Sequence, residues 1–346
     1  MAKIIYGVSG QGFGHAARSY ETLMHLKKQG HQVVVLSYNQ GAKFLKKYFR
    51  VINIPGFGLN YKDNKVVYWR TVYDNAKTLI TESKNWPKIL KQVRRFKPDL
   101  IITDFEPLSA NIAHLERLPL ISIDNQHQLT NTKITVPKKY QRDFITDSLV
   151  VKTMVWGADY YLVTSFFKTK ITKPKTFLFP PIVREPVAKL KPAIKNFIFV
   201  YQNSSFDSLV DELRKVKQEK FVIYRNVTGD KTIDNVTIKD FSHQSLTDMK
   251  NCKAIIGTAG LSLISEALWL KKPYFAIPVA HQVEQTLNAL NLKKMGYGDW
   301  AENLTASNLT QFIKKLPTYR KNLNKKPKED VKAMYKKLDS IIASLV

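Results

Sequence analysis

The 346-residue sequence contains a single cysteine, Cys252, so an internal disulfide framework and a cysteine-based zinc finger are both excluded. It has no apolar run near the ~20 residues that a membrane-spanning helix needs. The N-terminal segment also lacks the pattern of a secretory signal peptide. From these absences we expect a cytoplasmic protein.

Acidic residues are scarce relative to basic ones. The chain has 28 Asp and Glu against 55 Lys and Arg, a formal net charge of +27, which favours polyanionic partners. Residues 133–195 hold 13 basic and 4 acidic residues, and residues 314–337 hold 10 and 2. Nucleic acid is not expected, because neither a reading helix nor an aromatic stacking sheet is recognisable. The remaining candidate partner is an anionic membrane surface at the inner face. The alternative is that the basic residues form a solvated lysine-rich surface without a partner.

The chain alternates short apolar runs with helical patterns. Continuous Val, Ile and Leu runs predict parallel strands buried on both faces at Lys3–Val8, Gln32–Leu36, Val51–Ile54, Leu100–Thr103 and Leu120–Ile123. Five prolines between Pro174 and Pro192 predict a linker. Strands then resume at Phe197–Tyr201, Phe221–Tyr224, Val236–Ile238, Ala254–Ile256 and Tyr274–Ile277.

We therefore predict an α/β protein of two Rossmann-like, doubly wound domains that face a central cleft. The first spans residues 1–185 and the second residues 190–325. Residues 326–346 carry a helix whose apolar face would pack back on the first domain. Loops at the carboxyl ends of the strands are where ligands bind in such sheets.

A glycine loop follows the first strand as Gly10-Gln11-Gly12-Phe13-Gly14-His15. A nicotinamide or flavin dinucleotide site is rejected for two reasons. Glycine recurs here at every second position, and His15 stands where that motif has its third glycine. The second strand also ends without an acidic residue for the ribose. Two interpretations remain. The loop holds part of a sugar or its acceptor, with His15 as a base, or it is a tight turn that starts a helix.

A second glycine loop, Gly257-Thr258-Ala259-Gly260, lies between a strand and a helix from residue 261 to 271. A helix N-terminus behind small residues suits a diphosphate. Glu266, about one and a half turns into this helix, can accept hydrogen bonds from ribose hydroxyls. Glu284 and Gln285 follow the next strand and suit the hydroxyls of a sugar, or they are solvated residues at a helix start.

These segments, residues 10–18, 257–268 and 278–289, resemble inverting glycosyltransferases of the GT-B architecture. Within the UDP-glycosyltransferase superfamily, the chain is similar in pattern to the bacterial cell-wall N-acetylglucosaminyltransferases and to a related branch of uncharacterised bacterial and archaeal glycosyltransferases. The resemblance implies transfer of a hexose or N-acetylhexosamine from a nucleotide-sugar substrate, usually UDP-linked, to a lipid-linked or cell-envelope glycan acceptor. No cofactor is implied, because the nucleotide-sugar is a substrate.

The resemblance also implies donor contacts in the second domain. The nucleobase would lie near Phe241 and Ser242, and the ribose would bind Glu266. Donor-sugar contacts would come from Glu284 and Gln285, with His281 as a further contact. The diphosphate contacts would be Thr258, Ala259, Gly260, Leu261 and Ser262. Ser204 lies in a loop that lacks the glycines common in the family.

Catalysis by inversion needs a base for the acceptor hydroxyl, and the first domain offers two candidates. We favour His15, because a histidine ordinarily titrates at about pH 6.5, near working pH. Asp104 is the second candidate, as a base or as the group that orients His15, and its alternative role is to cap the helix that starts at Pro107. The predicted acceptor contacts are Gly12, Gly14, Arg18, Glu106, Asn125, Gln126 and His127.

The sequence contains no Asp-x-Asp motif and its seven histidines are scattered, so we expect catalysis without a metal. Two other functions stay open. A nucleotide-sugar epimerase on the same fold would form product without an acceptor. A non-catalytic polyanion or nucleic-acid binder would ignore nucleotide-sugars, and the two polar glycine loops argue against it.

Overall fold

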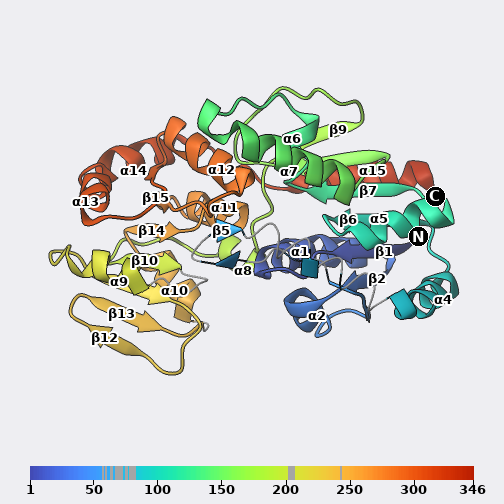
Figure 1. Ribbon diagram of the computed structural model, residues 1–346, viewed down its shortest axis with the longest axis horizontal. Helices are drawn as coiled ribbons and strands as arrows, with labels where there is room; N and C mark the ends of the chain where they lie inside the picture. The colour runs from blue at the N-terminus through green and yellow to red at the C-terminus, as the bar shows by residue number, and fades with distance from the viewer. Residues whose placement is uncertain are drawn as a thin grey trace. The chain divides into compact units, whose positions relative to one another are not determined.

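The computed structural model describes residues 1–56, 58, 61–62, 65–66, 73–74, 77, 83–201, 207–241 and 244–346 (Figure 1). Its contacts divide the chain into two compact units. Unit 1 comprises Met1–Asn60, Val67–Ile182 and Asp330–Val346, and unit 2 comprises Tyr61–Val66 and Val183–Glu329. The last segment of the chain is therefore grouped with the first unit.

Unit 1 is built on a parallel sheet of seven strands in the order β3-β2-β1-β6-β7-β8-β9. All residues of the central strands β6 and β7 are buried, as expected for strands covered by helices on both faces. The strands are β1 (Lys3–Val8), β2 (Gln32–Ser37), β3 (Val51–Asn53), β6 (Leu100–Asp104), β7 (Leu120–Asp124), β8 (Tyr160–Thr164) and β9 (Thr176–Phe179). The helices are α1 (Phe13–Lys28), α2 (Asn39–Leu45), α4 (Trp86–Phe96), α5 (Pro107–Glu116), α6 (Gln128–Asn131), α7 (Gln141–Met154) and α15 (Lys332–Leu345), with the short 3-10 helices η1 (Ser83–Asn85) and η2 (Lys138–Tyr140).

Helix α15 completes the core of unit 1 although it follows the whole of unit 2 in the chain (Figure 1). Met334, Leu338, Ile341 and Ile342 are buried in the same cluster as the β1 and β6 side chains. On α1, His25 forms an ion pair with Asp339 at 2.8 Å and stacks on the ring of Tyr335 at 4.3 Å between centroids. The apolar face that the sequence predicts is therefore the face that packs.

Unit 2 contains the second seven-stranded sheet, in the order β12-β13-β11-β10-β14-β15-β16, with β12 antiparallel at one edge. Its strands are β10 (Ile198–Tyr201), β11 (Phe221–Tyr224), β12 (Lys231–Ile233), β13 (Val236–Lys239), β14 (Ala254–Gly257), β15 (Tyr274–Ala276) and β16 (Gly298–Trp300). A separate two-stranded ribbon is formed by β4 (Tyr61–Lys62) and β5 (Lys65–Val66). The helices are α8 (Glu185–Ala188), α9 (Asp207–Arg214), α10 (Gln244–Asn251), α11 (Leu261–Trp269), α12 (Val283–Lys294), α13 (Ala306–Lys314) and α14 (Leu316–Lys325).

Both sheets are doubly wound, which confirms the predicted fold class. In each sheet the order of connection reverses at the centre, between β1 and β6 in unit 1 and between β10 and β14 in unit 2. Ligands bind at the carboxyl ends of the strands beside such a switch point. In unit 1 the topology therefore brings the loop after β1 to the end of β6. In unit 2 it singles out the loop after β14.

Candidate functional site

Asp104, the last residue of β6, is the centre of a buried polar cluster in unit 1. One carboxylate oxygen lies 2.9 Å from His15 Nδ1 and also accepts a hydrogen bond from Arg18 Nη2. The other accepts from Arg18 Nε and from Ser19 Oγ, each at 2.8 Å. Asp104 is 1% exposed. All three partners lie within the first two turns of α1, so one helix surrounds the carboxylate.

The charge of Asp104 is fixed by these partners. Burial opposes its ionisation, but the positive charge of Arg18, together with His15 and their hydrogen bonds, outweighs burial and lowers the pKa of Asp104 well below its usual range. A carboxylate that is ionised, buried and occupied on both oxygens is a poor proton acceptor for a substrate. The geometry therefore suits Asp104 to orienting His15 rather than to acting as the base.

The tautomer of His15 depends on two competing neighbours of the same nitrogen. Nδ1 lies 2.9 Å from Asp104 Oδ1 and 2.9 Å from Arg18 Nη2. If Nδ1 carries the proton it donates to Asp104, and the lone pair of Nε2 is available to a substrate hydroxyl. If Nδ1 accepts from Arg18 instead, the neutral ring carries its proton on Nε2 and cannot act as a base. A hydrogen bond from Nδ1 to Asp104 favours the first tautomer, and the contact with Arg18 favours the second.

Phe105 follows Asp104 with a positive φ of 52°, which is unfavourable for an aromatic residue. Such a conformation costs on the order of 1–3 kcal/mol and occurs most often at functional sites. Here the sharp turn ends β6 at Asp104 and begins α5 two residues later. The backbone strain at Phe105 therefore lies directly beside the Asp104 carboxylate, in the turn that positions it.

Glu106 caps α5, the role that the sequence analysis considered for Asp104. Its two carboxylate oxygens accept hydrogen bonds from the backbone N–H groups of Leu108 at 2.9 Å and Ser109 at 2.6 Å. The side chain is completely buried. Burial raises the pKa of Glu106 to about 7, although the hydrogen bonds from Ser109 and Leu108 act in the opposite direction.

The ionisation of Glu106 predicts a pH effect on stability. The pKa of Glu106 is about 7 in the folded protein and ordinarily 4.5. Its contribution to the unfolding free energy is therefore fully present below about pH 4.5 and is lost as pH rises through 7. Relative to Glu106→Gln, the wild type should lose about 3 kcal/mol of unfolding free energy between pH 4.5 and 8. Urea denaturation across this range measures the difference. Glu116→Gln, at the other end of α5, is the control, and parallel curves for wild type and Glu106→Gln would contradict the assignment.

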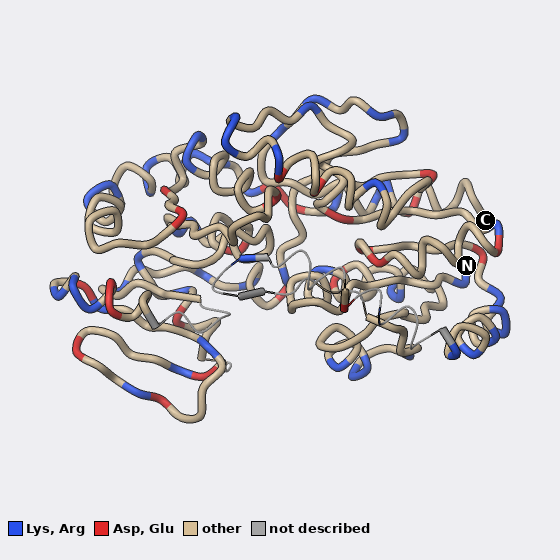
Figure 2. The backbone as a smooth tube through the Cα atoms, in the orientation of Figure 1, with Lys and Arg blue, Asp and Glu red and all other residues tan. Residues whose placement is uncertain are grey.

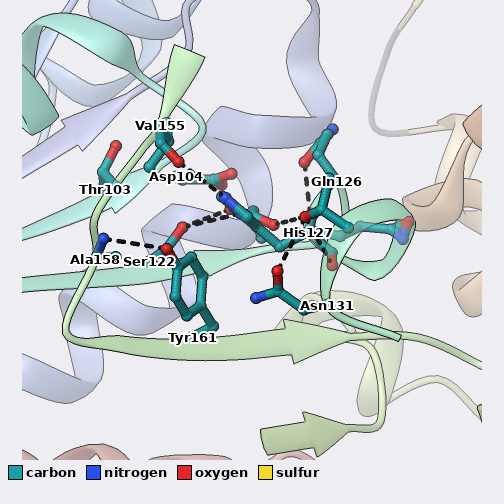
Figure 3. Close-up of polar contacts among 12 residues, drawn as sticks. Thr103, Asp104, Ser122, Gln126, His127, Asn131, Val155, Ala158 and Tyr161 are labelled. Carbon is teal, nitrogen blue, oxygen red and sulfur yellow. Dashed lines mark hydrogen bonds and ion pairs between the residues drawn. The ribbon is translucent and has the colours of Figure 1, made fainter. Parts of the chain in front are cut away.

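His127 and Asp124 form a second buried pair beyond the end of β7. Nδ1 of His127 lies 2.6 Å from Asp124 Oδ2, and Nε2 lies 3.1 Å from the carbonyl oxygen of Val155. Both neighbours are acceptors, so at least one ring nitrogen of His127 donates a hydrogen bond to them. Figure 3 shows the ring between Ser122 and Val155.

The predicted acceptor contacts therefore differ in their access to a ligand. Glu106, Asn125 and His127 are 0%, 1% and 2% exposed, and Glu106 and His127 make the internal contacts described above. The acceptor roles of these three residues remain predictions. Gln126 is half-buried, and its Oε1 lies 3.5 Å from Arg18 Nη2 beside the Asp104 cluster.

The glycine loop positions the start of α1. Gly12 is the N-cap residue with φ of 75°, a conformation that favours glycine. A Cβ on Gly10 would lie 2.0 Å from the carbonyl oxygen of Tyr38, so a side chain does not fit there. Gly14 lies in the first turn of α1, next to His15. The loop's conformation thus directs His15 and Arg18 towards Asp104.

In unit 2 the loop between β14 and α11 is fixed by three side chains. Gln285 Oε1 accepts from the N–H of Ala259 at 3.1 Å, and Asn288 Nδ2 donates to the Ala259 carbonyl at 3.0 Å. Tyr274 donates to the carbonyl oxygen of Thr258 at 2.6 Å. Helix α11 then begins at Leu261, and its N-cap residue, Gly260, supplies no side-chain hydrogen bond to the helix start. The N–H groups of Leu261 and Ser262 are therefore at the positive end of the helix dipole.

Gln285 has a positioning role that sequence reasoning missed. The same Oε1 also accepts from the N–H of Val279 at 3.1 Å, so one amide connects the loop after β14 to the loop after β15. In that second loop, His281 has a positive φ of 64°, the same unfavourable region as Phe105. Glu284, in the first turn of α12, is half-buried. The donor-sugar roles of His281, Glu284 and Gln285 remain predictions.

Glu266 is held by an arginine that no sequence motif pairs with it. Arg184 Nε and Nη2 donate to the two carboxylate oxygens of Glu266 at 2.5 and 2.8 Å. Glu266 is 3% exposed, and Arg184 lies 82 residues earlier, just before α8. Each oxygen keeps a further lone pair for a hydroxyl. The pair therefore fixes the carboxylate without exhausting it as an acceptor.

Phe241 follows β13 and is 40% exposed. Its ring lies 5.3 Å from that of Tyr201 at the end of β10, between centroids. An exposed ring supported by a second ring is a suitable surface for stacking a nucleobase. Ser204 and Ser242 lie outside the described residues, so their predicted roles have no structural context here.

Two doubly wound sheets with polar loops at their switch points are typical of the GT-B architecture, and comparison with known proteins adds the activity. Residues 2–317 match the family model described as glycosyl transferase family 1. The chain belongs to this family and is a glycosyltransferase.

Its relatives are distant in sequence. An uncharacterized glycosyltransferase of Methanosarcina acetivorans is 24% identical over 332 residues, which cover 86% of this chain and 84% of that protein. The glycotransferase of kitacinnamycin has a TM-score of 0.64 at 16% identity and covers 93% of both chains. LpCGTa, solved in complex with UDP, has a TM-score of 0.63 at 13% identity, covering 94% of this chain and 93% of its own. At these identities the structural matches show the fold.

Proposed function

We propose that the protein is an inverting, metal-independent glycosyltransferase. It transfers a hexose or N-acetylhexosamine from a nucleotide-sugar to a lipid-linked or cell-envelope glycan acceptor. The observation that carries the proposal is the His15–Asp104 pair at the switch point of unit 1, with a 2.9 Å contact that can hold His15 in the base-competent tautomer.

In the proposed reaction the acceptor hydroxyl oxygen attacks the anomeric carbon from the face opposite the diphosphate. The bond between that carbon and the diphosphate oxygen breaks, and the configuration at the anomeric carbon is inverted. His15 Nε2 takes the hydroxyl proton, while Asp104 accepts the hydrogen bond from Nδ1 and stabilises the imidazolium. The proposed acceptor contacts are those predicted from the sequence: Gly12, Gly14, Arg18, Glu106, Asn125, Gln126 and His127.

The donor site is proposed on unit 2, and it uses backbone groups in place of a metal. The departing diphosphate would meet the N–H groups at the start of α11, after Thr258, Ala259 and Gly260. Glu266 would accept hydrogen bonds from the ribose, and Phe241 would stack on the base. UDP is the first nucleotide to test, because a structural neighbour was solved with UDP bound. No cofactor is proposed.

The net charge of +27 supports an acceptor that is reached at an anionic surface. A lipid-linked acceptor places the reactive hydroxyl at a membrane, where basic residues each contribute about 1 kcal/mol near an anionic leaflet. We therefore propose reversible association with such a membrane as part of the function.

A thermal-shift panel with UDP, GDP, dTDP, CMP, NAD and short DNA tests the donor site. Binding to the folded state stabilises by about 2.7 kcal/mol when the ligand is at a hundredfold excess over Kd. One nucleoside diphosphate should raise Tm, and Glu266→Ala should weaken its binding about 10–100-fold, as expected for the loss of hydrogen bonds to a charged group.

A matched control separates the ribose contact from local damage. Arg184→Gln leaves the Glu266 carboxylate in place but removes its ion pair, so binding should weaken by a smaller factor. A shift with DNA or NAD alone would overturn the donor-site proposal. Product formed from nucleotide-sugar in the absence of any acceptor would favour the epimerase instead.

A further inference from the structure

Helix α7 exposes apolar side chains of the kind that an amphipathic helix normally buries. Of its 14 residues, all of them described, Val151 is the single buried one. Ile145 is 63% exposed and Leu149 is 61% exposed, and the two lie four residues apart on one face. Val150, beside them, is 39% exposed. Isolated exposed apolar residues are ordinary, but an aliphatic row on one helix marks an interaction surface.

Cations stand at both ends of this row. Arg142 is three residues before Ile145, and Lys152 is three residues after Leu149, so all four side chains share the outward face of α7. All four are exposed. The two acids of α7, Asp143 and Asp147, fall on the half-buried side of the helix. The outward face therefore combines aliphatic and positive side chains.

The surroundings of α7 extend the positive charge. Lys138 and Lys139 lie in η2, immediately before the helix, and both are exposed. The N–H of Lys133 donates a hydrogen bond to the carbonyl oxygen of Lys170, which brings segment 168–173, exposed except for Thr169, next to the chain that leads into α7. From residue 133 to residue 175 the sequence has nine basic and three acidic residues. Figure 2 shows Lys and Arg on the loops beside α7 and β9.

We propose that the outward face of α7, defined by Arg142, Ile145, Leu149 and Lys152, docks on the surface of an anionic lipid bilayer. The aliphatic side chains enter the boundary between headgroups and acyl chains, while the long basic side chains keep their charges at the phosphates. The positive charge of this face favours an anionic lipid surface over an uncharged apolar partner. Within the described residues no helix is long and apolar enough to cross a bilayer, and docking of this kind requires none.

Membrane docking would bring the enzyme to the proposed lipid-linked acceptor, and in that respect the inference rests on the proposed function. The docking itself depends only on the side chains of α7 and not on catalysis. Co-sedimentation of the full chain with phosphatidylglycerol–phosphatidylcholine vesicles at low salt tests it. The wild type should pellet with these vesicles, remain in solution with phosphatidylcholine alone, and be released by high salt.

Two double variants distinguish the two parts of the surface. Ile145→Ser with Leu149→Ser should lower partitioning into anionic vesicles at least about 10-fold, since two aliphatic side chains leave the interface. Arg142→Gln with Lys152→Gln should lower it about 30-fold at low salt and weaken the salt dependence. Leu115→Ser, at a 57% exposed apolar position on α5, is the matched control and should bind as the wild type does.

Several outcomes would overturn the proposal. One is that the wild type does not pellet with anionic vesicles at low salt, and another is that the Ile145 and Leu149 variant pellets equally well. A dimer in sedimentation velocity that the same double variant converts to a monomer would show that a second copy covers the face. The nucleotide-induced rise in Tm is measured on each variant, so a failure of membrane docking is separated from a failure of the donor site.

Discussion

Replacing His15 with alanine should lower kcat by about 10²- to 10⁴-fold and leave nucleotide-sugar binding unchanged. The residue is the proposed proton acceptor, and the donor contacts are proposed on other elements of the chain. Transfer of a radiolabelled sugar into extracted membrane lipid measures kcat, with the donor identified by the thermal-shift panel. The ligand-induced rise in Tm measures donor binding on the same preparation.

Two further variants make this result interpretable. His15→Asn can still donate a hydrogen bond to Asp104 but supplies no imidazole, so it should be as inactive as His15→Ala. His25→Ala removes a histidine ten residues further along α1, where it pairs with Asp339 and Tyr335, and should retain kcat. A His15→Ala enzyme with wild-type kcat would assign the base elsewhere.

Asp104→Asn should reduce the unfolding free energy by about 3–5 kcal/mol at pH 7, because it leaves the Arg18 guanidinium buried without its carboxylate. Arg18 is 8% exposed and directs both Nε and Nη2 at Asp104. The neutral amide can accept fewer of these hydrogen bonds and carries no charge. Urea denaturation measures the loss.

The same variant should change the response to acid. Since the pKa of Asp104 is depressed in the folded state, its stabilisation is present above its unfolded pKa near 4 and is lost as pH falls towards the lower folded value. The difference between wild type and Asp104→Asn should therefore be largest at neutral pH and shrink below about pH 4. Asp339→Asn, at a 35% exposed ion pair, is the control and should lose less than about 1 kcal/mol. If Asp104→Asn lost equally little unfolding free energy, the buried Asp104–Arg18 ion pair would not stabilise the protein as proposed.

Local sequence signals predicted much of the fold. The run Lys3–Val8 is β1 to the residue, and the run Leu100–Thr103 falls one residue short of β6. These strands are buried on both faces, so their apolar runs are continuous. By contrast, β8 and β9 were missed. Strand β9 ends in the proline-rich segment that was interpreted as a linker, and lysines at 173 and 175 precede it.

The site was predictable where its residues follow strands, and less so where partners meet across the chain. His15 and Asp104 were expected near each other because parallel strands bring their carboxyl ends to one edge of the sheet. The pairing of Arg184 with Glu266 joins residues 82 positions apart, and neither lies in a motif that implies the other. Capping was considered for Asp104 because of Pro107, but the turn at Phe105 places Glu106 at the helix start.

The position of α15 has a consequence for biosynthesis. Its four buried side chains belong to the core of unit 1, but the ribosome makes them after residues 183–329, which form most of unit 2. At ~5–20 residues per second this interval is about 7–30 s. During that time the strands of β1 and β6 exist without the helix that covers them, so the nascent first unit exposes apolar surface while the second unit is being translated. A chaperone that binds nascent chains has this interval in which to act, and stalling within unit 2 would leave the first unit incomplete.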